Sequence, residues 1–235
     1  MKTAYIALLF SLVISSNAQA GPSALDALKA SNPTLYGLYQ AYPGHRHALE
    51  RYADTQGFRN PVERLGTVIH ELVHIDSLTH QGFFVDGVYY EPYVRRDAWP
   101  ALSNKDLVGV LPDSEKGAIF RLYVMNAPGN HLGNVIDEIN AYDHVLPFVC
   151  QYEPSSTEKQ VSNLVQFLTL AEGYLRTLHA TQPANYQQFA QSREARGATV
   201  LIIQRARAAL QKCGFLLPAA AHPETNSLLL SPLPG

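Results

Sequence analysis

Five consecutive residues, His70-Glu71-Leu72-Val73-His74, combine side chains and a spacing that suit metal-assisted hydrolysis. Residues four apart lie on one face of a helix, so both imidazoles can reach a single cation. Glu71 points to the side of that face, where its carboxylate can take a proton from a metal-bound water and pass it to a leaving group. Because zinc lowers the pKa of such a water towards 7, the motif predicts zinc-dependent hydrolysis with Glu71 as general base.

A catalytic zinc usually has three protein ligands, and Glu138 is the favoured third candidate. It falls within the apolar stripe of a predicted helix, formed by Val135, Ile139, Tyr142 and Leu146. A carboxylate on an inward face needs a partner, and a metal ion is one.

His80 competes with Glu138 for the third position. It follows His74 with the histidine spacing of the H-E-x-x-H-x-x-G-x-x-H pattern, although Ser77 stands where that pattern has glycine. If the helix continues to about residue 81, six steps of about 100° place His80 about 240° around the helix axis from His74. His80 then points away from the other two histidines. A histidine in a last helical turn also interacts favourably with the helix dipole.

The motif followed by a glutamate on a later helix resembles the gluzincin class of zinc metallopeptidases. The segment Glu138-Ile139-Asn140-Ala141-Tyr142 is similar to the E-x-x-A-Y/F ligand helix of several of its branches. The resemblance covers about residues 61–146. It implies zinc on His70, His74 and Glu138, with Glu71 as general base and acid. It departs from the thermolysin-like branch, which has aspartate where this chain has Tyr142.

Supporting residues can be named only as sets of candidates. Metal-bound histidines usually donate their other N–H group to a carboxylate or a carbonyl. The candidates for this role are Asp76, Asp143 and Asn140. An oxyanion stabiliser is needed opposite the base. Its candidates are Tyr142, Tyr89, Tyr90 and His131.

The elements that must position these residues are mainly helical. Asn60-Pro61 is a typical helix start, and apolar residues then recur at helical spacing as far as a stop near Gly82. Asp86-Gly87 predicts the turn of a hairpin over 83–93. The other predicted helices cover 24–42, broken at Asn32-Pro33, and 114–125, 134–146, 157–181 and 185–212. Residues 43–60 are expected to form a loop, and Pro147 is expected to end the 134–146 helix.

The two ends of the chain are predicted to lie outside the folded part. Residues 1–20 have a basic start, a short apolar run and an Ala18-Gln19-Ala20 ending, which are typical of a secretory signal peptide. The ten apolar residues are too few to span a bilayer. Residues 217–235 are rich in proline and small residues and are expected to be loosely held. A single mainly α (α+β) domain is therefore expected over 21–216, and the resemblance to gluzincins implies that its fold is zincin-like.

Cysteine content and charge narrow the classes of protein. Export makes a structural disulfide between Cys150 and Cys213 the favoured state, with two free thiols as the alternative. Of the 235 residues, 46% are hydrophobic and 16% charged, which excludes a solvated disordered chain. The formal charge of -2 gives no basic excess for nucleic acid.

The sequence therefore predicts a secreted or periplasmic zinc metallopeptidase that acts on a peptide or protein substrate, with no membrane span once the signal is removed. Two alternatives remain open. One is an exported protein that binds zinc without catalysis, which predicts bound metal but no turnover dependent on Glu71. The other is a helical interaction module without metal. Metal content separates the last alternative from the other two.

Overall fold

The computed structural model describes residues 23–90, 99, 102, 104–126 and 131–215, and its architecture is mainly helical with one small hairpin. The elements in chain order are α1 (Ala24–Ser31), α2 (Pro33–Ala41), α3 (Pro43–Thr55), α4 (Pro61–His80), β1 (Phe83–Val85), β2 (Val88–Tyr90), α5 (Asn104–Val110), the short turns η1 (Asp113–Glu115) and α6 (Ala118–Phe120), the π-helical turn η2 (Arg121–Met125), α7 (Leu132–Tyr152), η3 (Pro154–Ser156), α8 (Thr157–Thr181), α9 (Pro183–Gln191) and α10 (Arg193–Lys212). The predicted signal peptide and tail lie outside the described residues.

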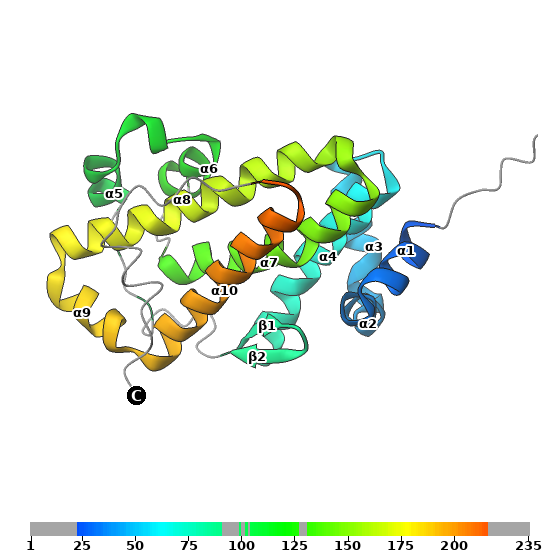
Figure 1. The fold of residues 1–235 in the computed structure, drawn as a ribbon, viewed down its shortest axis with the longest axis horizontal. Helices are drawn as coiled ribbons and strands as arrows, with labels where there is room; N and C mark the ends of the chain where they lie inside the picture. Colours follow the sequence, from blue (N-terminus) through cyan, green and yellow to red (C-terminus); the bar gives the residue numbers. More distant parts are fainter. Residues whose placement is uncertain (1–22, 91–98, 100–101, 103, 127–130, 216–235) are drawn as a thin grey trace, which may run out of the picture.

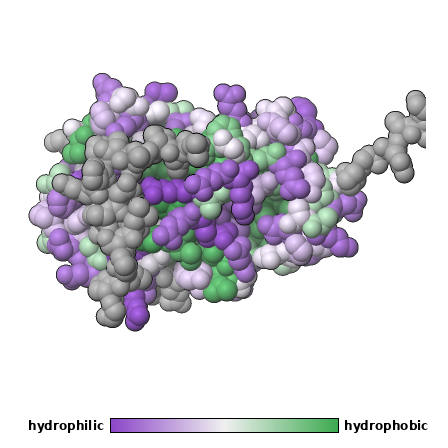
Figure 2. Space-filling view, in the orientation of Figure 1, coloured by the Kyte–Doolittle hydropathy of each residue, from purple (hydrophilic) through white to green (hydrophobic). Residues whose placement is uncertain are grey.

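Helix α7 lies at the centre of the molecule and contacts α4, α8 and α10. In Figure 1, α10 crosses in front of α7, α8 rises from the left-hand end below α5 and α6 to the upper right, and α1 to α3 gather at the right-hand end. Figure 2 shows that hydrophilic residues predominate in the middle of this face, where α10 crosses it. Among the helices of the described ranges, none is both long and apolar enough to cross a membrane.

Opposite faces of α7 support two separate clusters of buried hydrophobic side chains. The larger cluster joins one face, which includes Leu132 and Ile136, to α8 and α10. The smaller cluster joins the other face, which includes Ala141 and Val145, to α1, α2 and α4. Since side chains on opposite faces of one helix cannot meet, α7 separates two cores and positions both.

The start of α4 and the hairpin that follows it confirm two sequence predictions. The Asn60 side chain caps α4 by accepting hydrogen bonds from the backbone N–H groups of Val62 and Glu63. Asp86 and Gly87 both have positive φ, as expected for the two central residues of a tight hairpin turn. At the other end, α4 stops at His80, close to the stop predicted near Gly82, and Gln81 takes the left-handed conformation. A Cβ on Gly82 would lie 2.8 Å from the Cβ of Tyr89, so this glycine allows β2 to approach.

Three sequence predictions about helix boundaries are wrong. Residues 43–60 were expected to form a loop, but Pro43 occupies the first turn of α3, a position that favours proline. The helix expected over 134–146 begins at Leu132 and continues through Pro147 to Tyr152. The helix expected over 185–212 is two helices, separated at Ser192, whose side chain caps α10.

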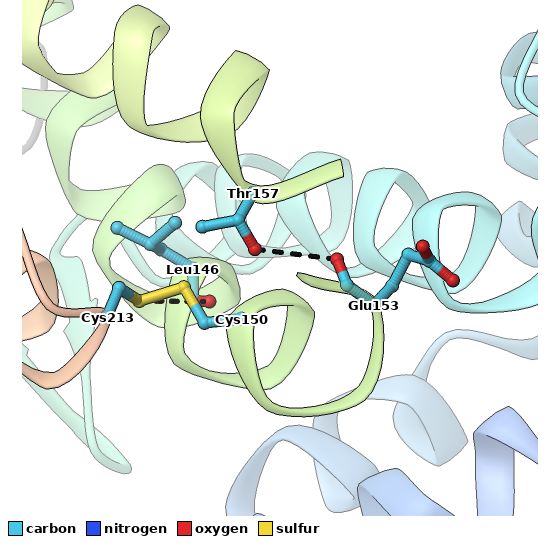
Figure 3. Close-up of a disulfide and its surroundings, with 5 residues drawn as sticks. All are labelled: Leu146, Cys150, Glu153, Thr157 and Cys213. Carbon is cyan, nitrogen blue, oxygen red and sulfur yellow. Dashed lines mark hydrogen bonds between the residues drawn. A yellow bond between two sulfur atoms is a disulfide. The ribbon is translucent and has the colours of Figure 1, made fainter. Parts of the chain in front are cut away.

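A disulfide between Cys150 on α7 and Cys213 at the end of α10 confirms the predicted pairing. Figure 3 shows the bond beside Leu146, one turn before Cys150. In the same view, the Thr157 hydroxyl at the start of α8 donates to the Glu153 carbonyl. Three helices are therefore tied together at one end of α7. Such a bond is compatible with an oxidising compartment.

Candidate metal centre

Helix α4 presents His70 and His74 on one face, as their spacing predicts. An adjacent face of the helix is anchored by Ile69, Leu72 and Val73, which are buried in the smaller cluster. This anchoring fixes the rotation of α4, so the two imidazoles point towards α7. Their Nε2 atoms lie 3.2 Å apart.

Close packing of α7 against α4 brings Glu138 to the two histidines. A Cβ on Gly66 would lie only 3.1 Å from methyl groups of Val145 and Val149, so this glycine allows α4 and α7 to pack closely. Glu138 Oε2 lies 3.3 Å from His70 Nε2 and 3.7 Å from His74 Nε2. The three residues form a group whose ligand atoms lie within 4.8 Å of one another and that could hold a metal ion.

Asp137 orients His74 from the opposite side of its ring. Its Oδ2 lies 2.7 Å from His74 Nδ1, so the ring nitrogen donates to the carboxylate. In the neutral imidazole this arrangement leaves a lone pair on Nε2, the atom that faces His70 and Glu138. Sequence reasoning missed Asp137, because a helix starting at residue 134 places it in the first turn, where an acid only favours the helix dipole. The actual start at Leu132 places it further along the helix, beside α4.

Tyr123 and Tyr142 complete the surroundings of Glu138 and His70. The Tyr123 hydroxyl donates to Glu138 Oε1 at 2.5 Å, from the π-helical turn η2. The Tyr142 ring meets the His70 ring edge-on at 4.6 Å, and its hydroxyl accepts a hydrogen bond from Asn163. Tyr123 carried no signal in the sequence, since its role depends on where η2 packs. A π-helical turn is itself frequent at functional positions.

The charges of the cluster favour a cation at its centre. Burial lowers the pKa of the His74 imidazole, but the carboxylates of Asp137 and Glu138 outweigh it and raise that pKa well above 6.5. Burial raises the pKa of the Glu138 carboxyl, but the imidazoles of His70 and His74 hold it well below its usual range. A metal cation could therefore take the place of the His74 proton between these carboxylates.

Glu71 lines a pocket of about 250 Å³ together with His70 and Glu138, whereas His74 is not part of its lining. Aromatic side chains make up much of its wall, namely Tyr52, Phe58, Tyr123, Tyr142 and Phe167. Burial, together with the negative charges of Glu71 and Glu138, raises the pKa of the Tyr52 hydroxyl. That hydroxyl therefore stays protonated at neutral pH and can donate a hydrogen bond.

Several predicted residues lie away from this cluster. The ring of His80 stacks on Tyr89, and its Nδ1 lies 3.0 Å from the backbone carbonyl oxygen of Asp76. The helix does continue to His80, which is the case in which this residue was expected to point away. Of the oxyanion candidates, Tyr142 lines the pocket, whereas Tyr89, Tyr90 and His131 do not.

The expected partners of the histidine rings also have other roles. Asp76 accepts hydrogen bonds from the hydroxyls of Tyr42 and Tyr89. Asp143 accepts one from Arg205. Asn140 donates to the Phe84 carbonyl and so holds the hairpin on α7.

Comparisons of the chain with protein-family models, with curated proteins and with solved structures found no match. The resemblance to gluzincins therefore depends on the residues and their geometry. The residues concerned are two histidines one turn apart on α4, the glutamate between them, and a second glutamate on the neighbouring helix α7.

Proposed function

We propose that this protein is an exported zinc-dependent hydrolase of peptide or amide bonds, of the gluzincin type. The observation that carries the proposal is the convergence of His70, His74 and Glu138 next to a pocket that Glu71 also lines. Two imidazoles and one carboxylate form a ligand set found in catalytic zinc sites, which leave one position open. Export rests on the predicted signal peptide and agrees with the disulfide.

The distances within the cluster support zinc in particular. Two ligand atoms that each lie about 2.05 Å from a tetrahedral ion are about 3.3 Å apart. The three pairs here are separated by 3.2, 3.3 and 3.7 Å. The Asp137–His74 contact is also the kind of carboxylate–histidine pair that accompanies metal-bound histidines. Zinc, when bound, activates water and polarises a carbonyl group as a Lewis acid.

The remaining chemistry falls to residues of the pocket. Glu71, as a carboxylate, accepts a proton from a water molecule in the pocket and later donates it to the leaving nitrogen. Asp137 keeps the His74 ring in one orientation, and Tyr123 does the same for the Glu138 carboxylate. Tyr142 and Tyr52 place hydroxyl groups on the same pocket, where a donor can stabilise negative charge that develops on the substrate oxygen.

The proposal is tested by comparing the metal content and the hydrolytic activity of wild type and Glu71→Gln. We expect one zinc ion per chain in both proteins, because Glu71 is not a ligand. Hydrolysis of a mixed peptide substrate should fall about 10²- to 10⁴-fold in the variant, since general base catalysis is lost. Wild-type activity in Glu71→Gln would refute the mechanism.

The ligand set is tested with a matched pair of variants. Glu138→Ala should lose zinc, whereas His80→Ala should keep it, because His80 contacts Asp76 and Tyr89 instead. Loss of zinc in His80→Ala alone would reverse the assignment of the third ligand. Zinc without turnover in wild type would favour a metal-binding protein, and absence of zinc would favour an interaction module.

A further inference from the structure

The pocket beside the candidate metal centre has a cation on its wall. Lys159, from the first turn of α8, is the one lysine or arginine that lines this pocket among the described residues. The acids on the lining are Glu71 and Glu138. A ligand in this pocket therefore meets negative side chains in one part and a positive one in another.

Lys159 is held in place by an aromatic ring rather than by an acid. Its Nζ lies 4.6 Å from the centroid of the Phe58 ring, within the range of a cation–π contact. In the described part of the chain, no carboxylate lies within ion-pair distance of this ammonium group. The positive charge is therefore available to a ligand, and its position is restricted by Phe58.

Phe58, which contacts the cation, and the metal ligand His70 lie at different ends of the α4 side of the pocket. Phe58 lies just before the first turn of α4, whereas His70 is nine residues into that helix from Pro61. At 1.5 Å per residue, this corresponds to about 13 Å along the helix axis. An extended peptide covers at most about 3.3–3.6 Å per residue, so a short peptide can connect the two ends.

The size and walls of the pocket also favour a short ligand. Its volume of about 250 Å³ lies below the roughly 300–1,000 Å³ of most small-molecule pockets. Neither strand of the hairpin lines it, so the described strands offer no edge along which a long substrate could pair. The aromatic wall suits an apolar or aromatic side chain of the substrate.

We propose that this pocket selects short peptides by their free C-terminal carboxylate, which binds Lys159, while the scissile carbonyl lies at the His70–His74–Glu138 end. This inference rests on the proposed hydrolase function and specifies its substrate class. The product released from the Lys159 end is a short peptide of about four residues, the number needed to span about 13 Å at 3.3–3.6 Å per residue.

The test uses N-acetylated peptides of four to seven residues that include aromatic residues, each prepared as the free acid and as the C-terminal amide. The zinc-loaded wild type should cleave the acids with a lower KM than the amides. Lys159→Gln should raise the KM for the acids by up to about fivefold and leave the amides unchanged, as expected for an ion pair at an exposed lysine. Lys159→Arg should keep the preference.

A matched control and a binding measurement complete the design. Lys29 also packs over an aromatic ring, that of Tyr36, but lies outside the pocket, so Lys29→Gln should behave like wild type. Calorimetry with zinc-loaded Glu71→Gln should show tighter binding of the uncleaved acids than of the amides.

The possible results separate this inference from the function on which it rests. Equal cleavage of acids and amides, with activity still dependent on Glu71, would overturn the carboxylate preference and leave the hydrolase proposal intact. An equal loss for both substrate types in Lys159→Gln would also overturn it, since Lys159 would then serve the structure alone. If the peptides are neither cleaved nor bound, this inference fails, and the hydrolase proposal fails as well only if the mixed peptide substrate is not hydrolysed either.

Discussion

Asp137 shows how a single residue outside the ligand set can control a metal centre. Its carboxylate lies 2.7 Å from His74 Nδ1 and directs the other ring nitrogen towards His70 and Glu138. We expect Asp137→Asn to lower the affinity for zinc about 10- to 100-fold, as is typical for loss of such a partner. Competition with a chromogenic chelator measures this affinity.

Asp113→Asn is the control for Asp137→Asn, because Asp113 is an exposed acid that pairs with Lys116. It should leave the zinc affinity unchanged. An unchanged affinity in Asp137→Asn as well would show that the contact with His74 does not orient the ligand.

The sequence alone identifies the residues of this centre that repeat at helical spacing. His70 and His74 follow from their separation of four, and Glu138 follows from its place on an apolar face. Asp137 and Tyr123 could not be predicted in the same way. Their roles depend on the first residue of α7 and on the packing of η2, and both are set by tertiary contacts rather than by local pattern.

At the scale of elements, the start of α7 depends on a glycine. A Cβ on Gly133 would lie 2.8–2.9 Å from three atoms of the Trp99 ring, which is buried. Gly133→Ala should therefore lower the free energy of unfolding by about 1–3 kcal/mol. Denaturant titration followed by circular dichroism measures the change.

Gly37, in the exposed part of α2, provides the matched substitution. A Cβ there meets nothing within 4 Å. Gly37→Ala should raise the free energy of unfolding by up to about 1 kcal/mol, since alanine favours helix more than glycine does. Equal effects of the two substitutions would mean that Trp99 can move aside at little cost.

Prolines explain most of the difference between the expected and the observed helices. Pro43 was read as part of a loop, but proline also fits the first turn of a helix, and Pro33, Pro61 and Pro183 occupy that position too. Pro147 costs its helix about 3 kcal/mol. Helix α7 continues past it because contacts with its neighbours and the burial of Phe148 and Val149 offset that cost. A local pattern cannot include such contacts.

For the molecule as a whole, the Cys150–Cys213 bond closes a segment with a sequence separation of 63 residues. Replacement of both cysteines by serine should lower the free energy of unfolding by about 2–4 kcal/mol, mainly because the unfolded chain gains freedom. Reduction of the wild type should give a similar loss, and the double variant should not respond to reductant. Denaturant titration with and without reductant tests both expectations.

The division of the interior by α7 has a consequence for how the protein unfolds. His70 and His74 belong to a helix packed into the smaller cluster, whereas Tyr123, which holds Glu138, packs against the larger one. A metal ion bound by all three ligands would cross-link the two cores. Scanning calorimetry should then record a single cooperative transition for the loaded protein and a broader or divided one after chelation. The ion would thus stabilise the fold against heat in addition to its proposed role in hydrolysis.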